Sequence, residues 1–242
     1  SLTLLPLRTL EWTSRKGIQI TPTTLAAMLT GISSTLQVLV LPPIPLDLYN
    51  VPQLHCLQTL RFSLDSNVSE AHAQLLVHMT SLKTLYLRGN LFGSRANLSP
   101  SMCDALASCS LLTELNVEQC DVSQDSMDSL VRTLYRLPSL TKVYFYHLPM
   151  GELDLGAFWR TLNCLPLLHL CLLETQIPPQ GLLQCLDYCP TTLTNLDLFA
   201  NGVDTEVMQH MVKCPNLNQL KQLRVSYSTR NFDLDCELQV LD

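Results

Sequence analysis

The chain has 242 residues, of which 47% are hydrophobic, and its formal net charge is −6. This apolar content is ample for a folded core. The acidic balance, without a basic cluster, argues against non-specific nucleic-acid binding, which needs lysine and arginine to displace phosphate counterions. No apolar run approaches the roughly 18 residues that suggest a membrane span. We therefore expect no nucleic-acid partner and no membrane partner.

One short pattern recurs along the chain. The stretch from Leu193 to Asn201 has leucine at its first, fourth and sixth positions and asparagine at its ninth. Asn90 and Cys120 take the ninth position of two other copies, and the remaining copies keep only the apolar places. Because successive copies start 21 to 30 residues apart, the recurrence predicts a protein built from repeats. The nine copies begin at Leu7, Leu36, Leu57, Leu82, Leu112, Leu140, Leu167, Leu193 and Leu220.

Each copy predicts a short strand, and most copies are followed by an amphipathic helix. In the second copy the prolines at 42, 43 and 45 exclude a regular helix, so we expect a 3₁₀ turn or irregular segment between Leu46 and Gln53. After Val225 the sequence predicts no helix, and we expect an irregular cap on the last strand or a chain that continues past Asp242. The expected helices begin at cap residues or prolines, namely Thr21–Pro22, Ser69, Ser99–Pro100, Ser123, Asp154, Pro178–Pro179 and Asp204.

The pattern of Leu193, Leu196, Leu198 and Asn201, with helices between copies, resembles the leucine-rich repeat superfamily. The coil length resembles its ribonuclease-inhibitor-like or cysteine-containing type. This resemblance implies an α/β solenoid, or horseshoe, with a parallel concave sheet and helices on the convex side. We expect a single leucine-rich repeat domain of about nine coils over residues 1–242. Since the chain starts at Ser1 without an initiator methionine, we expect an excerpt of a longer chain.

Two spans carry a further likeness. Thr191–Leu217 reads TTLTNLDLFANGVDTEVMQHMVKCPNL and Ser34–Leu41 contains STLQVLVL. These spans are similar to the PRAME-like group of leucine-rich repeat proteins. That likeness implies a substrate receptor of a cullin–RING ubiquitin ligase, recruited through an elongin-binding motif ahead of the repeats. No matching adaptor-binding helix is present here, so a ligase adaptor would bind regions outside this chain.

The ten cysteines favour a reducing compartment. Several lie at repeat positions where a cysteine behaves as a small buried hydrophobe. We therefore expect an intracellular location, in the cytosol or the nucleus. Two N-x-S sequons, at Asn67 and Asn97, leave a secreted location open. The cysteines at repeat positions are Cys109, Cys120, Cys189 and Cys214.

The sequence shows no catalytic constellation. Cys185 and Cys189 lie one turn apart on an expected helix, with His169 and Cys171 in the strand before it. Zinc needs four converging ligands, and this spacing matches no common site, so buried core cysteines are favoured. There is also no phosphate-binding glycine-rich loop and no G-x-S-x-G motif. We expect no enzymatic activity, no metal and no cofactor.

The concave face carries the strongest functional signal. Successive side chains of a strand point to opposite faces of the sheet. The side chains two, four and six places after the first leucine therefore point away from the core. In the middle and later coils they are aromatic and charged, and such residues dominate the energetics of protein interfaces. The alternative is that half-exposed tyrosines are ordinary strand residues. The expected partner-binding residues are Arg61, Tyr86, Arg88, Glu114, Asn116, Glu118, Lys142, Tyr144, Tyr146, His169, Asp197 and Phe199.

These observations favour non-enzymatic recognition of a protein or peptide. The PRAME-like likeness implies the substrate receptor of a ubiquitin ligase. A second hypothesis is the ligand-sensing repeat domain of an innate immune receptor, which would have a nucleotide-binding domain upstream. A third is a pathogen effector or inhibitor that occludes a host protein, with Glu114, Glu118 and Asp197 mimicking a substrate.

Overall fold

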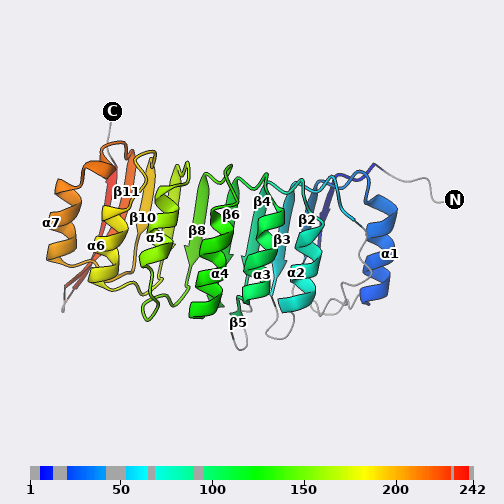
Figure 1. Cartoon of the computed structure of the whole chain (residues 1–242), viewed down its shortest axis with the longest axis horizontal. Helices are drawn as coiled ribbons and strands as arrows, with labels where there is room; N and C mark the ends of the chain where they lie inside the picture. Colours follow the sequence, from blue (N-terminus) through cyan, green and yellow to red (C-terminus); the bar gives the residue numbers. More distant parts are fainter. Residues whose placement is uncertain are drawn as a thin grey trace.

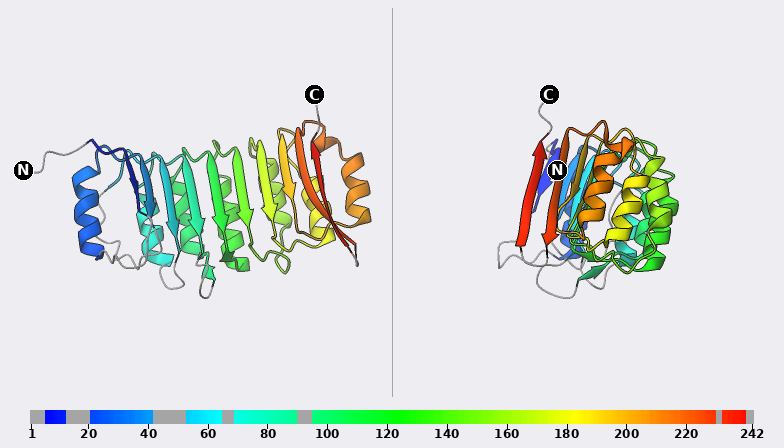
Figure 2. Two further views of the ribbon diagram at one scale, coloured as in Figure 1. Left: turned by 180° about the vertical axis from the view of Figure 1, so that it is seen from behind. Right: turned by 90° about the vertical axis from the view of Figure 1, so that its left-hand side faces the viewer.

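A computed structural model describes residues 6–12, 21–41, 53–64, 69–89, 95–229 and 232–239. This part of the chain is an elongated molecule with one layer of strands and one layer of helices (Figure 1). Seen from its end, the strands lie on one side and the helices on the other (Figure 2). The segment expected to be irregular after Leu46, the asparagine of the first sequon, Asn67, and the repeat residue Asn90 lie outside the described residues.

Within the described residues the main sheet has ten strands. The first nine are parallel and follow one another in chain order across the sheet. They are β1 (Thr9–Glu11), β2 (Val38–Leu41), β3 (Thr59–Ser63), β4 (Thr84–Arg88), β6 (Glu114–Glu118), β8 (Lys142–Tyr146), β9 (His169–Leu173), β10 (Asn195–Leu198) and β11 (Gln222–Thr229). The tenth strand, β12 (Phe232–Gln239), runs antiparallel to β11. A separate pair joins β5 (Ala96–Asn97) to β7 (Cys120–Asp121).

The strand register is the one that the repeats predict. Each strand aligns the fourth position of its copy with the fourth position of the next copy, so no strand slips against its neighbour. Because a slip of one residue would turn the buried side chains to the opposite face, the apolar pattern specifies this register. The aligned column is Leu10, Leu39, Leu60, Leu85, Leu115, Val143, Leu170, Leu196 and Leu223.

The helices form a row over one face of the sheet (Figure 1). Two 3₁₀ turns, at Leu106–Ser108 and Pro215–Leu217, extend the chain after α3 and α7. The apolar sides of the helices pack on the leucines of the strands, which places the core between the two layers. The helices are α1 (Pro22–Ile32), α2 (Ser69–Val77), α3 (Pro100–Ala105), α4 (Gln124–Leu134), α5 (Gly156–Asn163), α6 (Pro179–Asp187) and α7 (Thr205–Lys213). No described helix has the length and apolarity that a membrane crossing requires.

Polar caps begin four of these helices where the sequence predicts them. Each cap side chain accepts a hydrogen bond from the backbone N–H three residues later, which satisfies a donor that the helix leaves free. These caps are Thr21, Ser99, Ser123 and Asp204. The helix expected to begin at Asp154 begins at Gly156 instead. The Asp154 carboxylate, two positions before this helix, accepts a hydrogen bond from the Gly156 N–H at 3.0 Å.

The asparagine at the ninth repeat position joins two coils. Asn201 is 7% exposed, and its Oδ1 accepts a hydrogen bond from the Ile177 N–H at 3.1 Å. Its Nδ2 donates to the carbonyl of Leu172. Both partners belong to the preceding coil, so the side chain replaces backbone bonds where the chain turns. At the same position of an earlier coil, Cys120 is fully buried, and its thiol donates to the Glu118 carbonyl at 3.4 Å.

The C-terminal end differs from the expectation. An irregular cap was expected after Val225, but β11 continues to Thr229 and β12 returns along its full length. The sequence from Phe232 to Gln239 alternates apolar and polar residues, which is the period of a strand and not of a helix. The hairpin therefore pairs the edge that β11 would otherwise expose.

Candidate functional site: the open face of the sheet

The sheet face opposite the helices carries the predicted binding residues. We call it the open face, made by the side chains two, four and six positions after the first leucine of each copy. All twelve predicted residues lie there, and each is exposed or half-buried, whereas the leucines between them are buried. The structure thus brings together residues from β3 to β10 that are up to 138 positions apart, from Arg61 to Phe199.

Glu114 lies at the centre of a chain of contacts across four strands. The Tyr86 hydroxyl donates to Glu114 Oε1 at 2.6 Å, and Lys142 Nζ lies 3.5 Å from Glu114 Oε2. The Arg61 guanidinium stands over the Tyr86 ring, 4.0 Å from its centroid. Burial, followed by the hydrogen bond to Glu114, raises the pKa of Tyr86. The phenol therefore stays protonated and acts as a donor at neutral pH.

Two further pairs order the middle of the open face. Arg88 and Glu118, which are opposite each other on β4 and β6, lie 3.4 Å apart. The Tyr144 and Tyr146 rings are stacked, with centroids 6.1 Å apart and planes at 16°. Burial is the main cause that raises the pKa of both phenols, and so they too are neutral donors at physiological pH.

The C-terminal part of the open face is organised by Asp197. Its Oδ1 accepts from the Phe199 N–H at 2.9 Å, and its Oδ2 lies 3.4 Å from Arg224 Nη1. The Arg224 guanidinium also lies over the Phe199 ring, 4.2 Å from its centroid. Arg224 was not among the predicted binding residues. Its position, four residues after Leu220, is the signal that would have included it.

On the open face, the described residues line two hollows. The first hollow, of about 390 Å³, is formed by strands β2, β3, β4 and β6 and is lined on its polar side by Arg61, Ser63, Tyr86, Arg88, Asn116 and Glu118. The second hollow, of about 290 Å³, is formed by strands β8 to β11 and is lined by Tyr144, Tyr146, His169, Cys171, Asp197 and Arg224, among others. Neither set of lining residues was predicted as a hollow, because side-chain length and rotamer decide such shapes.

The titratable groups of the second hollow favour binding over covalent chemistry. Burial, with the nearby charge of Lys142, lowers the pKa of His169, so its imidazole is neutral at pH 7. Cys171 is 6% exposed, and burial, with the negative charge of Asp197, raises the pKa of its thiol to about 12. A protonated thiol is a poor nucleophile. The hollow offers hydrogen-bond donors, aromatic surface and one carboxylate.

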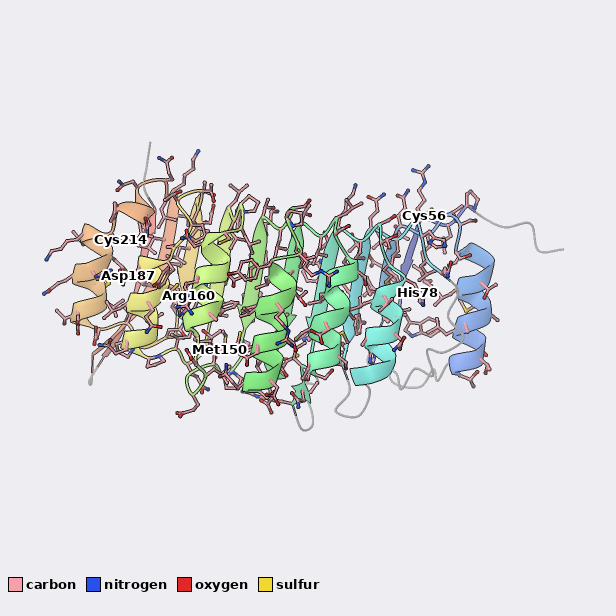
Figure 3. The ribbon with its side chains drawn as sticks, in the orientation of Figure 1. Cys56, His78, Met150, Arg160, Asp187 and Cys214 are labelled. Atoms are coloured by element: carbon pink, nitrogen blue, oxygen red, sulfur yellow. The ribbon has the colours of Figure 1, made fainter. Side chains whose placement is uncertain are left out.

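Most described cysteines are core residues, as the repeat positions predict. Cys185 and Cys189, which the sequence favoured as core over zinc ligands, are both 2% exposed. No group of three or more histidine, cysteine or acidic side chains within the described residues is placed to hold a metal ion. Cys56 is exposed and lies at the edge where the strands begin, whereas Cys214 is buried near α7 (Figure 3).

A third hollow lies in the helix layer, between α6 and α7. It measures about 400 Å³ and is lined by polar side chains that include Gln184, Asp187 and Lys213. His210 Nε2 lies 2.8 Å from Asp187 Oδ1, so this contact joins the two helices. The sequence did not predict this third hollow, because the repeat pattern constrains only the inner faces of these helices.

Comparison with known proteins agrees with this architecture. No family model matches the chain, and no curated protein matches it. Among solved structures, an internalin (inlF) from Listeria monocytogenes is similar, with 19% sequence identity and a TM-score of 0.50. The similar region covers 83% of this chain and 52% of that chain, so this chain spans about half the internalin's length. The likeness concerns the fold alone.

Proposed function

We propose that this chain is a non-enzymatic recognition module that binds a protein or peptide on its open face. The twelve predicted residues, together with Arg224, form the binding surface. The supporting observation is the chain of contacts from Arg61 through Tyr86 and Glu114 to Lys142. Side chains that are already held in place lose less conformational entropy on binding, which favours affinity.

The composition of the open face also supports a binding role. Tyrosine and arginine are enriched at protein interfaces, because they combine apolar area with hydrogen-bond donors. Here two arginines lie on aromatic rings, Arg61 on Tyr86 and Arg224 on Phe199. An arginine held on a ring is ordered, and it keeps free N–H groups for a partner.

Within this proposal, the finer function is substrate recognition for a cullin–RING ubiquitin ligase in the cytosol or nucleus. It rests on the likeness of Thr191–Leu217 and Ser34–Leu41 to PRAME-like proteins, with a ligase adaptor bound outside this chain. The ligand-sensing domain of an innate immune receptor and a pathogen effector that occludes a host protein are the alternatives. An intracellular location is supported by the described cysteines, which are free and mostly buried.

The proposal can be tested by affinity capture from cell lysate with mass spectrometry. Three forms are compared: wild type, a triple variant with Tyr86→Ala, Tyr144→Ala and Tyr146→Ala, and a control with Tyr135→Ala and Tyr188→Ala. The control tyrosines lie in the helix layer and are 58% and 37% exposed. We expect a partner that is retained by the control and lost by the triple variant.

A partner that the triple variant still binds would contradict the proposal. A partner that binds all three forms equally would place the binding site on the helices or at the ends of the solenoid. Recovery of ubiquitin-ligase substrates as the lost partners would support the finer function. Recovery of a single host enzyme whose activity the chain inhibits would favour the occluding inhibitor.

A further inference from the structure

We propose that the first hollow receives the carboxylate of an aspartate or glutamate side chain from the partner. This inference rests on the proposed function, since it requires the partner to bind the open face. It names the chemistry of one contact within that interface: an acidic residue of a peptide segment, held by Arg61 and Arg88 of neighbouring strands.

The donors of the first hollow suit a carboxylate. Arg61 and Arg88 supply guanidinium N–H groups, which bind carboxylates through two parallel hydrogen bonds. Asn116 adds an amide and Ser63 a hydroxyl. Both arginine side chains are exposed, so an incoming side chain reaches them without displacing part of the core.

Arg61 is ordered by its neighbours and forms no ion pair with an acidic residue in the part of the chain that the structure describes. Its guanidinium lies 4.0 Å from the Tyr86 ring centroid, and the Tyr86 hydroxyl is fixed by Glu114 at 2.6 Å. The charge of Glu114 is in turn offset by Lys142 at 3.5 Å. None of the ion pairs between described residues involves Arg61. The Arg61 guanidinium therefore has N–H groups available to bind an anion.

Arg88 is paired with Glu118, but this pair does not block the hollow. Their charged atoms lie 3.4 Å apart, and the side chains are 45% and 29% exposed. An ion pair this accessible to water contributes little to stability, because water screens the two charges. A second carboxylate can therefore share the Arg88 guanidinium without a large loss.

Local charge distinguishes the first hollow from the second. Its lining holds Arg61 and Arg88 against Glu118, a formal charge of two minus one, or +1. The second hollow holds Arg224 against Asp197, which is zero while His169 is neutral. The whole chain carries −6. A positive hollow on an acidic protein attracts an acidic side chain to this place on the open face.

The test uses a displayed library of random dodecapeptides selected on the whole chain. The affinity of each recovered peptide is measured by fluorescence anisotropy, before and after each acidic residue is replaced by its amide. The same peptides are measured on the double variant Arg61→Gln, Arg88→Gln. A matched control carries Arg136→Gln and Arg160→Gln in the helix layer, where Figure 3 shows Arg160.

We expect at least one acidic position whose amide replacement weakens binding about tenfold or more, the size of a lost charged hydrogen bond. The Arg61/Arg88 variant should show a similar loss and should no longer distinguish acid from amide. The control should bind like wild type. Arg61→Lys keeps the positive charge but loses the planar guanidinium. Its affinity for the peptides should lie between that of wild type and that of the Arg61/Arg88 variant. Thermal unfolding of each variant verifies that it is folded.

A variant of the second hollow, Tyr144→Ala with Tyr146→Ala, separates failure of this inference from failure of the proposed function. Peptides that depend on these tyrosines but not on Arg61, Arg88 or any acidic residue would overturn the inference and leave the open face as the binding site. Peptides indifferent to both variants, or a selection that yields none, would overturn both.

Discussion

Thr175 and Asn201 occupy the same repeat position in successive coils, and the Thr175 hydroxyl donates to Asn201 Oδ1 at 2.9 Å. Both side chains are buried, at 0% and 7% exposure. The Thr175 hydroxyl is also 3.3 Å from the carbonyl of its own Leu172, which Asn201 Nδ2 reaches from the next coil. The asparagine and the threonine therefore act as one polar unit that holds the two coils together.

This unit predicts a large effect of removing the Asn201 amide. Asn201→Leu keeps the size of the side chain, but it leaves the Ile177 N–H without its acceptor and removes the Nδ2 donor of the Leu172 and Leu198 carbonyls. Buried groups left unsatisfied cost about 1–3 kcal/mol each, so we expect unfolding to require about 2–5 kcal/mol less free energy. Urea unfolding measures this, with exposed Asn218→Leu as the control. An equal, small effect of both substitutions would contradict the role of the unit.

Gly89 is a second position at which we expect a substitution to destabilise the fold. A Cβ added there would lie 1.9 Å from the Gln119 carbonyl oxygen, which is backbone and cannot rotate away. Gly89→Ala must therefore shift one coil against the next, and we expect a loss of more than about 2 kcal/mol, as for other overpacked sites. Gly156→Ala is the matched control, because its nearest atom is a flexible side-chain oxygen, Asp154 Oδ1, at 3.3 Å. Chemical denaturation of the two variants should separate them clearly; similar midpoints would refute the steric account.

The two faces of β6 and its neighbours predict opposite responses to truncation. Leu115 is completely buried in the aligned leucine column, and Leu115→Ala should destabilise by about 2–5 kcal/mol. The triple replacement of Tyr86, Tyr144 and Tyr146 by alanine should leave a cooperatively folded chain, because these side chains point away from the core. Circular dichroism melts compare the two. A larger decrease of Tm in the tyrosine variant than in Leu115→Ala would contradict the assignment of these tyrosines to a binding surface.

Buried thiols predict a loss of stability in alkaline solution. Burial raises the pKa of Cys103, Cys109, Cys120 and Cys189 to about 12, well above the value of an unfolded cysteine. Above about pH 9 the unfolded chain loses these protons while the folded chain keeps them. The contribution of these thiols to the free energy of unfolding is therefore complete below about pH 8.5 and is lost between about pH 9 and 12. Each thiol lowers the free energy of unfolding by up to about 1.4 kcal/mol per pH unit in this range.

Urea unfolding at successive pH values tests this prediction. The midpoint should be steady from pH 7 to 8 and fall steeply from pH 9 to 10. A variant with Cys109→Ala and Cys189→Ala should start from a lower stability, because two buried side chains are shortened, and should fall less steeply. A midpoint that stays constant to pH 10 would show that the thiols titrate normally and are not buried.

The sequence predicted the layers and the register, because both depend on periodicity. The leucine column from Leu10 to Leu223 and the outward side of Tyr86 and Tyr144 follow from a period of two within strands. The contact of Tyr86 with Glu114 was not predicted, since the rotamers of two side chains on different strands decide it. β12 was missed because a helix was sought after Val225, and the alternation that follows is that of a strand.

The most direct test of the open face is the affinity of one purified partner, obtained by the capture experiment, for three forms of the chain. Isothermal titration calorimetry would compare wild type, the triple variant at Tyr86, Tyr144 and Tyr146, and the helix-layer control at Tyr135 and Tyr188. Loss of three interface tyrosines should weaken binding about 100-fold or more, while the control keeps the wild-type Kd. An unchanged Kd in the triple variant, with a weakened control, would contradict the account and place recognition on the helices.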